Sequence, residues 1–279
     1  IIDLCCTHYN KKVFEGIPFI RNCISYRPFN FRFSKIIRSE RYQILYNPKS
    51  GPSKTFHHLT NKINAEVKVC LNHKYNNPIY NYSLPNDNSK HIVEKYSELL
   101  HYYDDSSIVS NWLPEFFLKF PSNINNRKYI AINISAGHQS RKIPAEKWIR
   151  AIASILEINN TNIALFASRK ESRDAIKIKS VFKEKIFYPL ESPTLYHASG
   201  IINDSEMLLS VDTSLIHLAA ALGKPVLGLY NNDKLNYTRY SPYNTISENV
   251  VSKTGFIRDI DVESIIHSYK LLDLRIRNR

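Results

Sequence analysis

The sequence predicts an α/β protein with parallel sheets divided between two domains. From about residue 128 onward, apolar runs alternate with segments of helix length, which is the pattern of βαβ units. These runs are nearly continuous in apolar residues, as expected for parallel strands covered on both faces. The 279 residues, 43% of them hydrophobic, are enough for one large domain or two smaller ones.

The carboxyl-terminal part has the more regular pattern. The strands expected there are YIAINISA, NIALFA, KIFYPL, MLLSV and PVLGLY, and the expected helices cover residues 144–158, 171–182, 193–202 and 213–222. Gly223, followed by Pro225, is expected to end the last of these helices, because glycine adopts the left-handed conformation common at helix ends.

The amino-terminal part has a similar but noisier pattern. The strands expected there are IIDLCC, RNCISY, YQILYN and EVKVCL, and the candidate helices cover residues 9–16, 30–39, 53–62 and 88–102. Residues 104–127 contain two prolines and the polar run SNINNR, so they are expected to link the domains. We therefore predict domains at residues 1–120 and 121–279.

Composition limits where the protein works and what it binds. The apolar stretches are too short to span a membrane and the start IIDLCCTHYN lacks a signal peptide, so a soluble cytosolic chain is expected. The four cysteines show no metal-ligand spacing, so we expect reduced thiols, no metal and no cofactor. A net charge of +13 predicts an acidic partner, such as nucleic acid, an anionic membrane surface or a phosphorylated substrate.

One strand-to-helix turn concentrates polar side chains. Asp212, Thr213 and Ser214 follow the run MLLSV, and His217 comes about one helical turn later. Open parallel sheets bind ligands at the carboxyl ends of their strands, and a helix amino terminus favours an anion. Asp and Thr are also common helix caps, and a single His on a helix is usually structural. Taken alone, the turn fits capping better than binding.

Two segments together resemble a known family. The phrase VDTSLIHLAAALGKPVLGLY and the earlier INISAGHQSRKIPAEKW are similar to the two characteristic segments of glycosyltransferase family 9, the bacterial lipopolysaccharide heptosyltransferases. The resemblance implies a GT-B architecture, in which two Rossmann-like domains face a cleft. It also implies an inverting, metal-independent transfer of heptose, with ADP-heptose as the expected donor and the phosphorylated lipopolysaccharide or lipooligosaccharide inner core as the acceptor.

The resemblance also implies roles for individual residues. Asp212 matches the family residue that bonds the donor sugar, and Arg141 stands where the family usually has Lys. Thr213, Ser214 and His217 match the group around the diphosphate, where fixed N–H donors and a cation stabilise the departing nucleoside diphosphate. Ser214 is more often Gly in the family, which could alter the sugar or nucleotide that fits.

Three further residues are expected near the nucleotide. Glu171 follows the strand NIALFAS and matches a family acid that reaches the ribose, although a helix-dipole role fits it equally well. Ser192 and Pro193, in LESPTL, align with a loop near the base. Family members open with a first strand and a loop bearing the general base, whereas this chain begins at what looks like the second strand. Asp3 and His8 would only be guesses for that base, and the chain is either a fragment or a degenerate protein.

A basic segment predicts where the acceptor binds. The run RPFNFRFSKIIRSERY carries five Lys or Arg residues interleaved with phenylalanines, and a second basic loop, NPKSGPSK, follows a strand. We select Arg27, Arg32, Lys35, Lys49 and Lys54 as a patch for acceptor phosphates and anionic lipid. A solvated helix face is the simpler interpretation of such a charge run.

Competing functions remain open. A nucleotide-sugar-binding relic without acceptor chemistry is the first alternative, and a basic nucleic-acid-binding protein is the second, although no nucleic-acid-binding motif is present. A dinucleotide oxidoreductase is disfavoured because no G-x-G-x-x-G motif follows a strand. A nucleotide-sugar epimerase also remains possible. The favoured location is the cytoplasmic face of the bacterial inner membrane, in peripheral contact with the lipid.

Overall fold

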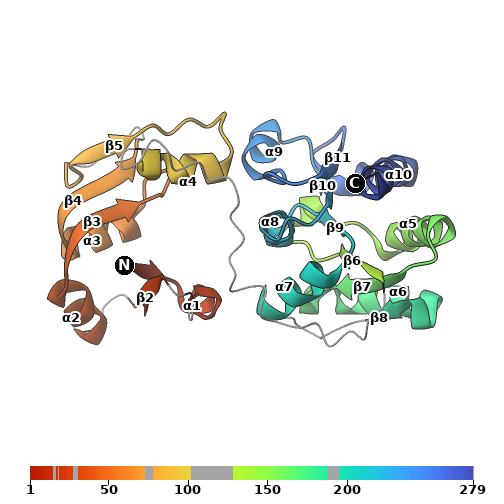
Figure 1. The fold of residues 1–279 in the computed structure, drawn as a ribbon, viewed down its shortest axis with the longest axis horizontal. Coiled ribbons are helices and arrows are strands. Elements are labelled where there is room, and N and C mark those ends of the chain that lie inside the picture. The colour runs from red at the N-terminus through yellow and green to blue at the C-terminus, as the bar shows by residue number, and fades with distance from the viewer. Residues whose placement is uncertain are drawn as a thin grey trace. The chain divides into compact units, whose positions relative to one another are not determined.

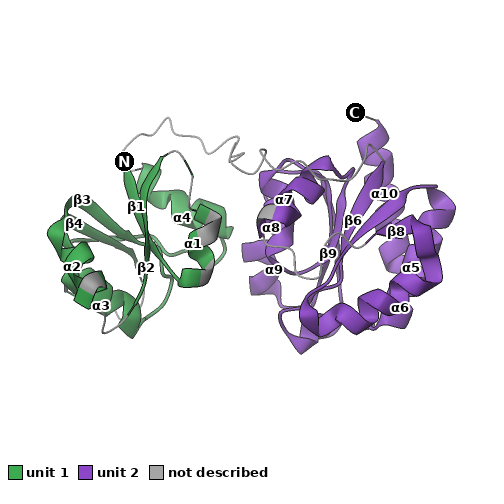
Figure 2. Ribbon diagram, turned by 90° about the horizontal axis from the view of Figure 1, so that it is seen from below, with its two compact units in different colours: residues 1–110 green, residues 111–279 purple. Residues whose placement is uncertain are grey.

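The computed structural model describes residues 1–14, 17, 19–27, 31–72, 78–101, 128–187 and 195–278. The chain forms two compact units, unit 1 (Ile1–Ser110) and unit 2 (Asn111–Arg279), shown in Figures 1 and 2. The predicted linker at 104–127 and the domain boundary at residue 120 lie outside the described residues. Every pair of strands within the described residues is parallel, so the predicted α/β class with parallel sheets is confirmed.

The described part of unit 1 contains two small parallel sheets. Its elements are β1 (Ile2–Cys6), α1 (His8–Phe14), β2 (Ile20–Ser25), α2 (Phe31–Ser39), β3 (Arg41–Asn47), α3 (Lys54–Lys62), β4 (Asn64–Leu71), β5 (Tyr82–Leu84) and α4 (Ile92–His101). One sheet has the order β1-β2 and the other has the order β3-β4-β5. The short strand β5 was not among the strands predicted from the sequence, because YSL is too brief to give a periodic signal.

Unit 2 contains one six-stranded sheet with the order β11-β10-β9-β6-β7-β8. Its elements are β6 (Tyr129–Asn133), α5 (Ala145–Ile158), β7 (Asn162–Phe166), α6 (Ser172–Phe182), β8 (Ile186–Phe187), α7 (Leu195–Asp204), β9 (Leu208–Val211), α8 (Ser214–Ala221), β10 (Val226–Tyr230), α9 (Lys234–Tyr240), β11 (Ser247–Val251) and α10 (Val262–Arg277). Short 3-10 turns include η2 (Gln139–Arg141) and η3 (Arg169–Glu171). The sequence did not predict the last three elements, α9, β11 and α10.

Helices cover both faces of the sheet in unit 2. Figure 2 shows α5, α6 and α10 over one face and α7, α8 and α9 over the other. Strands β6 and β10 are buried along their whole length, which explains why their sequences are apolar without alternation. The helix α5 buries Ala145, Trp148 and Ile152 at helical spacing against this sheet. Gly223 has φ +66°, which confirms that it ends α8.

A buried carboxylate connects the two sheets of unit 1. Asp3, on β1, accepts two hydrogen bonds from Arg21, at 2.9 and 2.6 Å, and one from the Tyr42 hydroxyl at 2.9 Å. Asn22 contributes a longer bond of 3.2 Å. The Arg21 hydrogen bond is the largest influence on the pKa of Asp3, which falls from 3.8 to about 2 although burial opposes the change. Because Tyr42 lies on β3, this network joins β1 to β3.

Asp3→Asn is expected to destabilise unit 1 by about 1–3 kcal/mol at pH 7, since hydrogen bonds to a charged group are lost. A lowered folded-state pKa stabilises the protein above pH 3.8, and this contribution disappears as the pH falls from 3.8 toward 2. As the pH falls from 3.8 toward 2, the Asp3→Asn variant should therefore lose less stability than the parent protein does. Thermal unfolding at several pH values measures this difference. Glu66→Gln, which breaks an exposed ion pair with Arg41, should change little. Equal acid sensitivity of Asp3→Asn and the parent protein would contradict this role.

Candidate functional site

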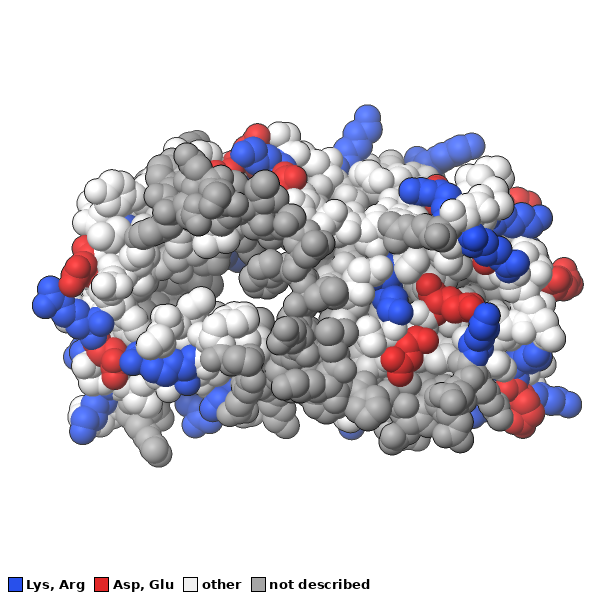
Figure 3. Space-filling view, in the orientation of Figure 1, with Lys and Arg blue, Asp and Glu red and all other residues white. Residues whose placement is uncertain are grey.

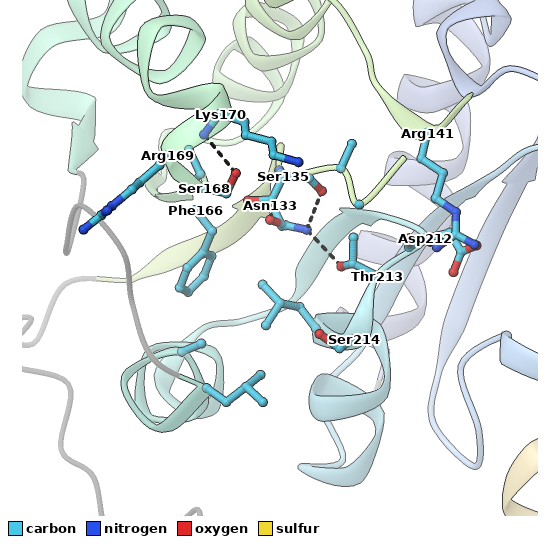
Figure 4. Close-up of a pocket in the computed structure, with 16 residues that line it drawn as sticks. Asn133, Ser135, Arg141, Phe166, Ser168, Arg169, Lys170, Asp212, Thr213 and Ser214 are labelled. Carbon is cyan, nitrogen blue, oxygen red and sulfur yellow. Dashed lines mark hydrogen bonds and ion pairs between the residues drawn. The ribbon is translucent and has the colours of Figure 1, made fainter. Parts of the chain in front are cut away.

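A pocket of about 560 Å³ opens at the carboxyl ends of three neighbouring strands of unit 2, β9, β6 and β7. The chain leaves β6 toward β7 on one side, while β9 lies on the other side, so the pocket sits where the strand order reverses. The described residues that line it are Asn133, Ser135, Ala136, Gly137, Arg141, Phe166, Ala167, Ser168, Arg169, Lys170, Leu195, Ala198, Asp212, Thr213, Ser214 and Leu215. Figure 4 shows these side chains around the cavity.

Asp212 and Arg141 form an ion pair at one side of this pocket. The Arg141 guanidinium lies 3.1 Å from Asp212 Oδ2 and also donates to the Asp212 backbone oxygen at 3.0 Å. Asn236, on α9, donates to the same carboxylate at 2.6 Å. Burial raises the pKa of Asp212, while the positive charge of Arg141 and the Asn236 hydrogen bond act against that rise. Arg141 is about one-third exposed, so the pair presents a cation to the cavity.

Thr213 and Ser214 begin α8 beside this ion pair. Thr213 is the residue that precedes the helix, but its hydroxyl makes no capping bond and instead accepts from Asn133 Nδ2 at 3.0 Å. Ser214, the first helical residue, is exposed and lines the pocket. The amino terminus of α8 therefore faces the cavity, where the helix dipole and first-turn N–H groups favour an anion.

Asn133 fixes the position of this turn. Its amide nitrogen donates to Ser210 Oγ at 2.9 Å as well as to Thr213, and its side-chain oxygen accepts from the Ser135 backbone N–H at 3.1 Å. These bonds connect the end of β6 with the end of β9. Asn133 was not among the residues predicted from the sequence, although a polar residue at the end of the apolar run YIAIN was an available signal.

Two more cations lie across the pocket from Arg141. Figure 4 shows Arg169 and Lys170 on the opposite side, where η3 follows β7. Both side chains are exposed, and Ser168 holds the turn by accepting from the Lys170 backbone N–H at 3.2 Å. The described pocket lining therefore contains three cations and one carboxylate, which is already paired. Neither residue was predicted from the sequence.

Two of the residues selected from the sequence do not line this pocket. Glu171 is buried, with 3% exposure, and its carboxylate accepts a hydrogen bond from the Ser168 hydroxyl. His217 is half-buried on α8, and its ring packs edge-on against Tyr240 of α9 at 5.9 Å between centroids. Ser192 and Pro193 lie outside the described residues.

The basic residues selected in unit 1 occupy several elements. Arg27 follows β2, Lys35 lies on α2, Lys49 follows β3 and Lys54 begins α3, and all four are exposed. Arg32 is on α2, and its side chain lies outside the described set. On the face drawn in Figure 3, described Lys and Arg side chains are spread widely and interleave with Asp and Glu.

The two residues considered as guesses for a general base differ in position. Asp3 lies near the amino-terminal end of β1 and is hydrogen-bonded to Arg21, Asn22 and Tyr42. That strand end is opposite to the end at which open parallel sheets bind ligands, so this geometry does not favour Asp3 as a base. His8 is exposed and begins α1, directly after the carboxyl end of β1.

Comparison with known proteins establishes the family. The family model described as glycosyltransferase family 9 (heptosyltransferase) matches residues 31–269, which is most of the chain. The chain belongs to glycosyltransferase family 9. This membership confirms the resemblance seen in the two sequence segments, and residues 31–269 include both of them.

Relatives and solved structures agree with family 9 membership. A curated relative from Escherichia coli (strain K12), provisionally named lipopolysaccharide heptosyltransferase 4, is 39% identical over 72 residues, which are 24% of this chain and 20% of the relative. The alignment therefore spans about a fifth of that relative's length. The structure of E. coli heptosyltransferase WaaC with ADP has a TM-score of 0.81 at 16% identity, covering 97% of this chain and 89% of the other.

A second WaaC structure, with ADP-2-deoxy-2-fluoro heptose, has a TM-score of 0.80 at 15% identity, covering 98% of this chain and 89% of the other. At these identities the similarity establishes a shared fold. Within the described ranges, no helix combines the length and the apolar character needed to cross a bilayer. Within the same ranges, no cluster of three or more His, Cys, Asp or Glu side chains could hold a metal ion.

Proposed function

We propose that this family 9 protein is an inverting glycosyltransferase that moves heptose from ADP-heptose to the inner core of lipopolysaccharide or lipooligosaccharide, without a metal. The observation that carries the proposal is the Arg141–Asp212 pair beside the amino terminus of α8, in a pocket at the strand ends. A cation and a helix dipole suit a diphosphate, and a carboxylate suits sugar hydroxyls. Family membership and the fold shared with WaaC support this choice of donor.

The proposed donor lies with its diphosphate at the start of α8. Thr213 and Ser214 supply hydrogen-bonding groups at the first turn of α8, and Arg141 supplies the positive charge. As the glycosidic bond breaks, negative charge grows on the departing diphosphate, so preorganised donors lower the barrier at this point. Asp212 accepts hydrogen bonds from the sugar hydroxyls, while its contacts with Asn236 and Arg141 hold the carboxylate in place.

The remaining residues have supporting roles in this proposal. Arg169 and Lys170 stabilise the anionic nucleotide from the opposite side of the pocket. His217 supports the diphosphate site from one turn further along α8, next to Tyr240. Glu171 binds the ribose when a ribose hydroxyl replaces Ser168 as the donor to its carboxylate. Ser192 and Pro193 remain predicted neighbours of the base.

The proposed acceptor binds to unit 1. Arg27, Arg32, Lys35, Lys49 and Lys54 are the proposed contacts for core phosphates and for an anionic membrane surface, because such groups attract exposed Lys and Arg. This makes the protein a peripheral one at the cytoplasmic face of the inner membrane. We assign the role of general base to none of the described residues.

A nucleotide titration tests the donor site. We expect calorimetry to show selective binding of ADP and ADP-heptose over UDP and GDP. Arg141→Ala should weaken ADP binding by about 10- to 100-fold, because hydrogen bonds to a charged phosphate contribute roughly 1.5–3 kcal/mol. Arg150→Ala, which removes an exposed arginine from α5, is the matched control and should bind as the parent does. Unchanged ADP binding by Arg141→Ala would refute the diphosphate site.

A binding-only role is the second candidate. The observation in its favour is that every described residue lining the pocket belongs to unit 2, so nucleotide-sugar binding needs no residue of unit 1. Both candidates predict the same nucleotide titration. They differ in a transfer assay with ADP-heptose and a phosphorylated inner-core acceptor, in which only the enzyme releases ADP in proportion to glycosylated product.

A further inference from the structure

A chain of hydrogen bonds runs from Asn133 to the pocket in unit 2. Asn133 ends β6 and is 1% exposed. Its side chain bonds Ser135, Ser210 and Thr213. Figure 4 draws the bond from Asn133 to Thr213 beside the cavity. The atom that gives the proton in each of these bonds decides what the Thr213 hydroxyl can offer to a ligand.

The Ser135 backbone fixes which way the Asn133 amide is turned. A backbone N–H can only donate, and the Ser135 backbone nitrogen lies 3.1 Å from Asn133 Oδ1. The amide nitrogen therefore faces the two hydroxyls. It gives one proton to Ser210 Oγ at 2.9 Å and the other to Thr213 Oγ1 at 3.0 Å. Its approach to the Ser135 backbone oxygen, at 3.5 Å, is too long to compete with these bonds.

The hydroxyl proton of Ser210 is already used. This hydroxyl donates to the Val211 backbone oxygen at 2.7 Å, and a carbonyl oxygen can only accept. Ser210 therefore has no proton left for Thr213, although the two hydroxyl oxygens lie 3.3 Å apart. Thr213 is the donor in any bond between them, and that separation is beyond the range of about 2.5–3.0 Å that is usual for a hydroxyl donor and an oxygen acceptor.

Thr213 consequently accepts one hydrogen bond and keeps its own proton for the pocket. Its side chain makes no capping bond to α8, and it lies half-buried in the pocket wall. A hydroxyl that accepts a hydrogen bond also becomes a stronger donor, because each bond in such a chain polarises the next. An ionised phosphate oxygen can accept hydrogen bonds but has no proton to donate, so it matches this hydroxyl.

We propose that Asn133 is a positioning residue that makes the Thr213 hydroxyl a hydrogen-bond donor to a phosphate oxygen of the nucleoside diphosphate. Because Asn133 is buried and its amide protons are used within the protein, it acts on the ligand through Thr213. The inference rests on the donor site proposed above, and it adds the residue that sets the direction of hydrogen bonding there.

A double-mutant cycle tests this role. Thr213→Val removes the hydroxyl and should weaken ADP binding by about tenfold, because a hydrogen bond to a charged group is lost. Asn133→Ala removes the bond that orients this hydroxyl and should weaken ADP binding by about fivefold. In the Thr213→Val protein, Asn133→Ala should change the affinity by less than about twofold, because no hydroxyl is left to orient. Calorimetric titration with ADP measures each affinity.

Three further variants separate orientation of the hydroxyl from general damage to the turn. Thr213→Ser keeps a hydroxyl, so Asn133→Ala should weaken ADP binding in that protein as it does in the parent. Asn159→Ala is the matched control, because it removes a 2.8 Å bond to the Tyr269 hydroxyl away from the pocket, and it should not change ADP affinity. Asn133→Asp keeps the shape of the side chain, but a carboxylate can only accept. It draws the Thr213 proton away from the ligand and should weaken ADP binding at least as much as Asn133→Ala.

A circular dichroism melt of each variant checks that it is folded. Where alanine at position 133 prevents folding, Asn133→Asp takes its place, and its effect should still be larger with the Thr213 hydroxyl than without it. Equal losses in the two backgrounds would show that Asn133 only supports the turn, and they would overturn the proposal. Unchanged ADP binding by Asn133→Ala or by Thr213→Val would overturn it too. A loss of binding in Arg141→Ala would then leave the donor site standing, whereas absence of ADP binding to the parent protein would remove both.

Discussion

Replacing Asp212 with Asn is expected to weaken binding of ADP-heptose by about 100-fold while changing the affinity for ADP much less. The carboxylate is buried at 4% exposure, and in the proposed complex it accepts from the donor sugar. Hydrogen bonds from sugar hydroxyls to a carboxylate contribute about 1.5–3 kcal/mol, and these bonds, unlike the contacts with Arg141 and Asn236, are made only when the sugar is present. Calorimetry with ADP and ADP-heptose on the same samples separates the sugar contribution from the nucleotide contribution.

A matched control and a double substitution make this result specific. Asp273→Asn breaks the surface pair with Arg277 on α10, at 2.8 Å, and should leave both affinities unchanged. Combining Asp212→Asn with Arg141→Ala should give less than the sum of the two losses, because the residues are in contact. If Asp212→Asn bound ADP-heptose as tightly as the parent protein, the sugar-binding assignment would be wrong.

Trp148→Ala is expected to destabilise unit 2 by about 3–5 kcal/mol, the largest effect on folding among our predictions. Trp148 is 1% exposed and lies in the core between α5 and the sheet, so truncation to alanine leaves a large cavity. For a unit of this size the melting temperature should fall by about 10 °C. Differential scanning calorimetry measures this change, and nucleotide binding at low temperature checks that the site persists.

Trp148→Phe is the control for that prediction. The indole Nε1 of Trp148 is buried and has no hydrogen-bond partner among the described residues. Phenylalanine removes this unsatisfied donor while keeping most of the apolar volume. Trp148→Phe should therefore destabilise unit 2 by less than half as much as Trp148→Ala. If Trp148→Ala lowered the free energy of unfolding by less than about 1 kcal/mol, the prediction would be wrong, because the core would then have collapsed to fill the cavity.

Local sequence signals predicted the strands and the turn that form the pocket. The runs that became β6, β7 and β9 are apolar enough to be recognised without any partner, and parallel strands place their carboxyl ends together. This reasoning drew attention to Asp212 to Ser214 but favoured helix capping there, and the family resemblance then assigned them to donor binding and added Arg141. The structure brings these residues to one pocket.

Contacts between distant segments could not be predicted in the same way. Asn133 bonds Thr213, which lies 80 positions away in the sequence, and Asn236 bonds Asp212 from α9, a helix that was not predicted from the sequence. Glu171 shows the reverse case, because its position after β7 suggested exposure to a ligand, while packing buries it against Ser168. Side-chain direction at a turn depends on neighbours that local periodicity does not encode.

The sequence by itself determined the α/β class, the parallel strands, the end of α8 at Gly223 and the family. These features follow from the local pattern of apolar residues, from backbone conformational preference and from two short motifs. Only the tertiary structure decided that Arg141 pairs with Asp212, that His217 packs on Tyr240, and that Asn133 reaches Thr213. Those outcomes depend on which strands and helices become neighbours, and the free energy of that packing is shared among residues far apart in the chain.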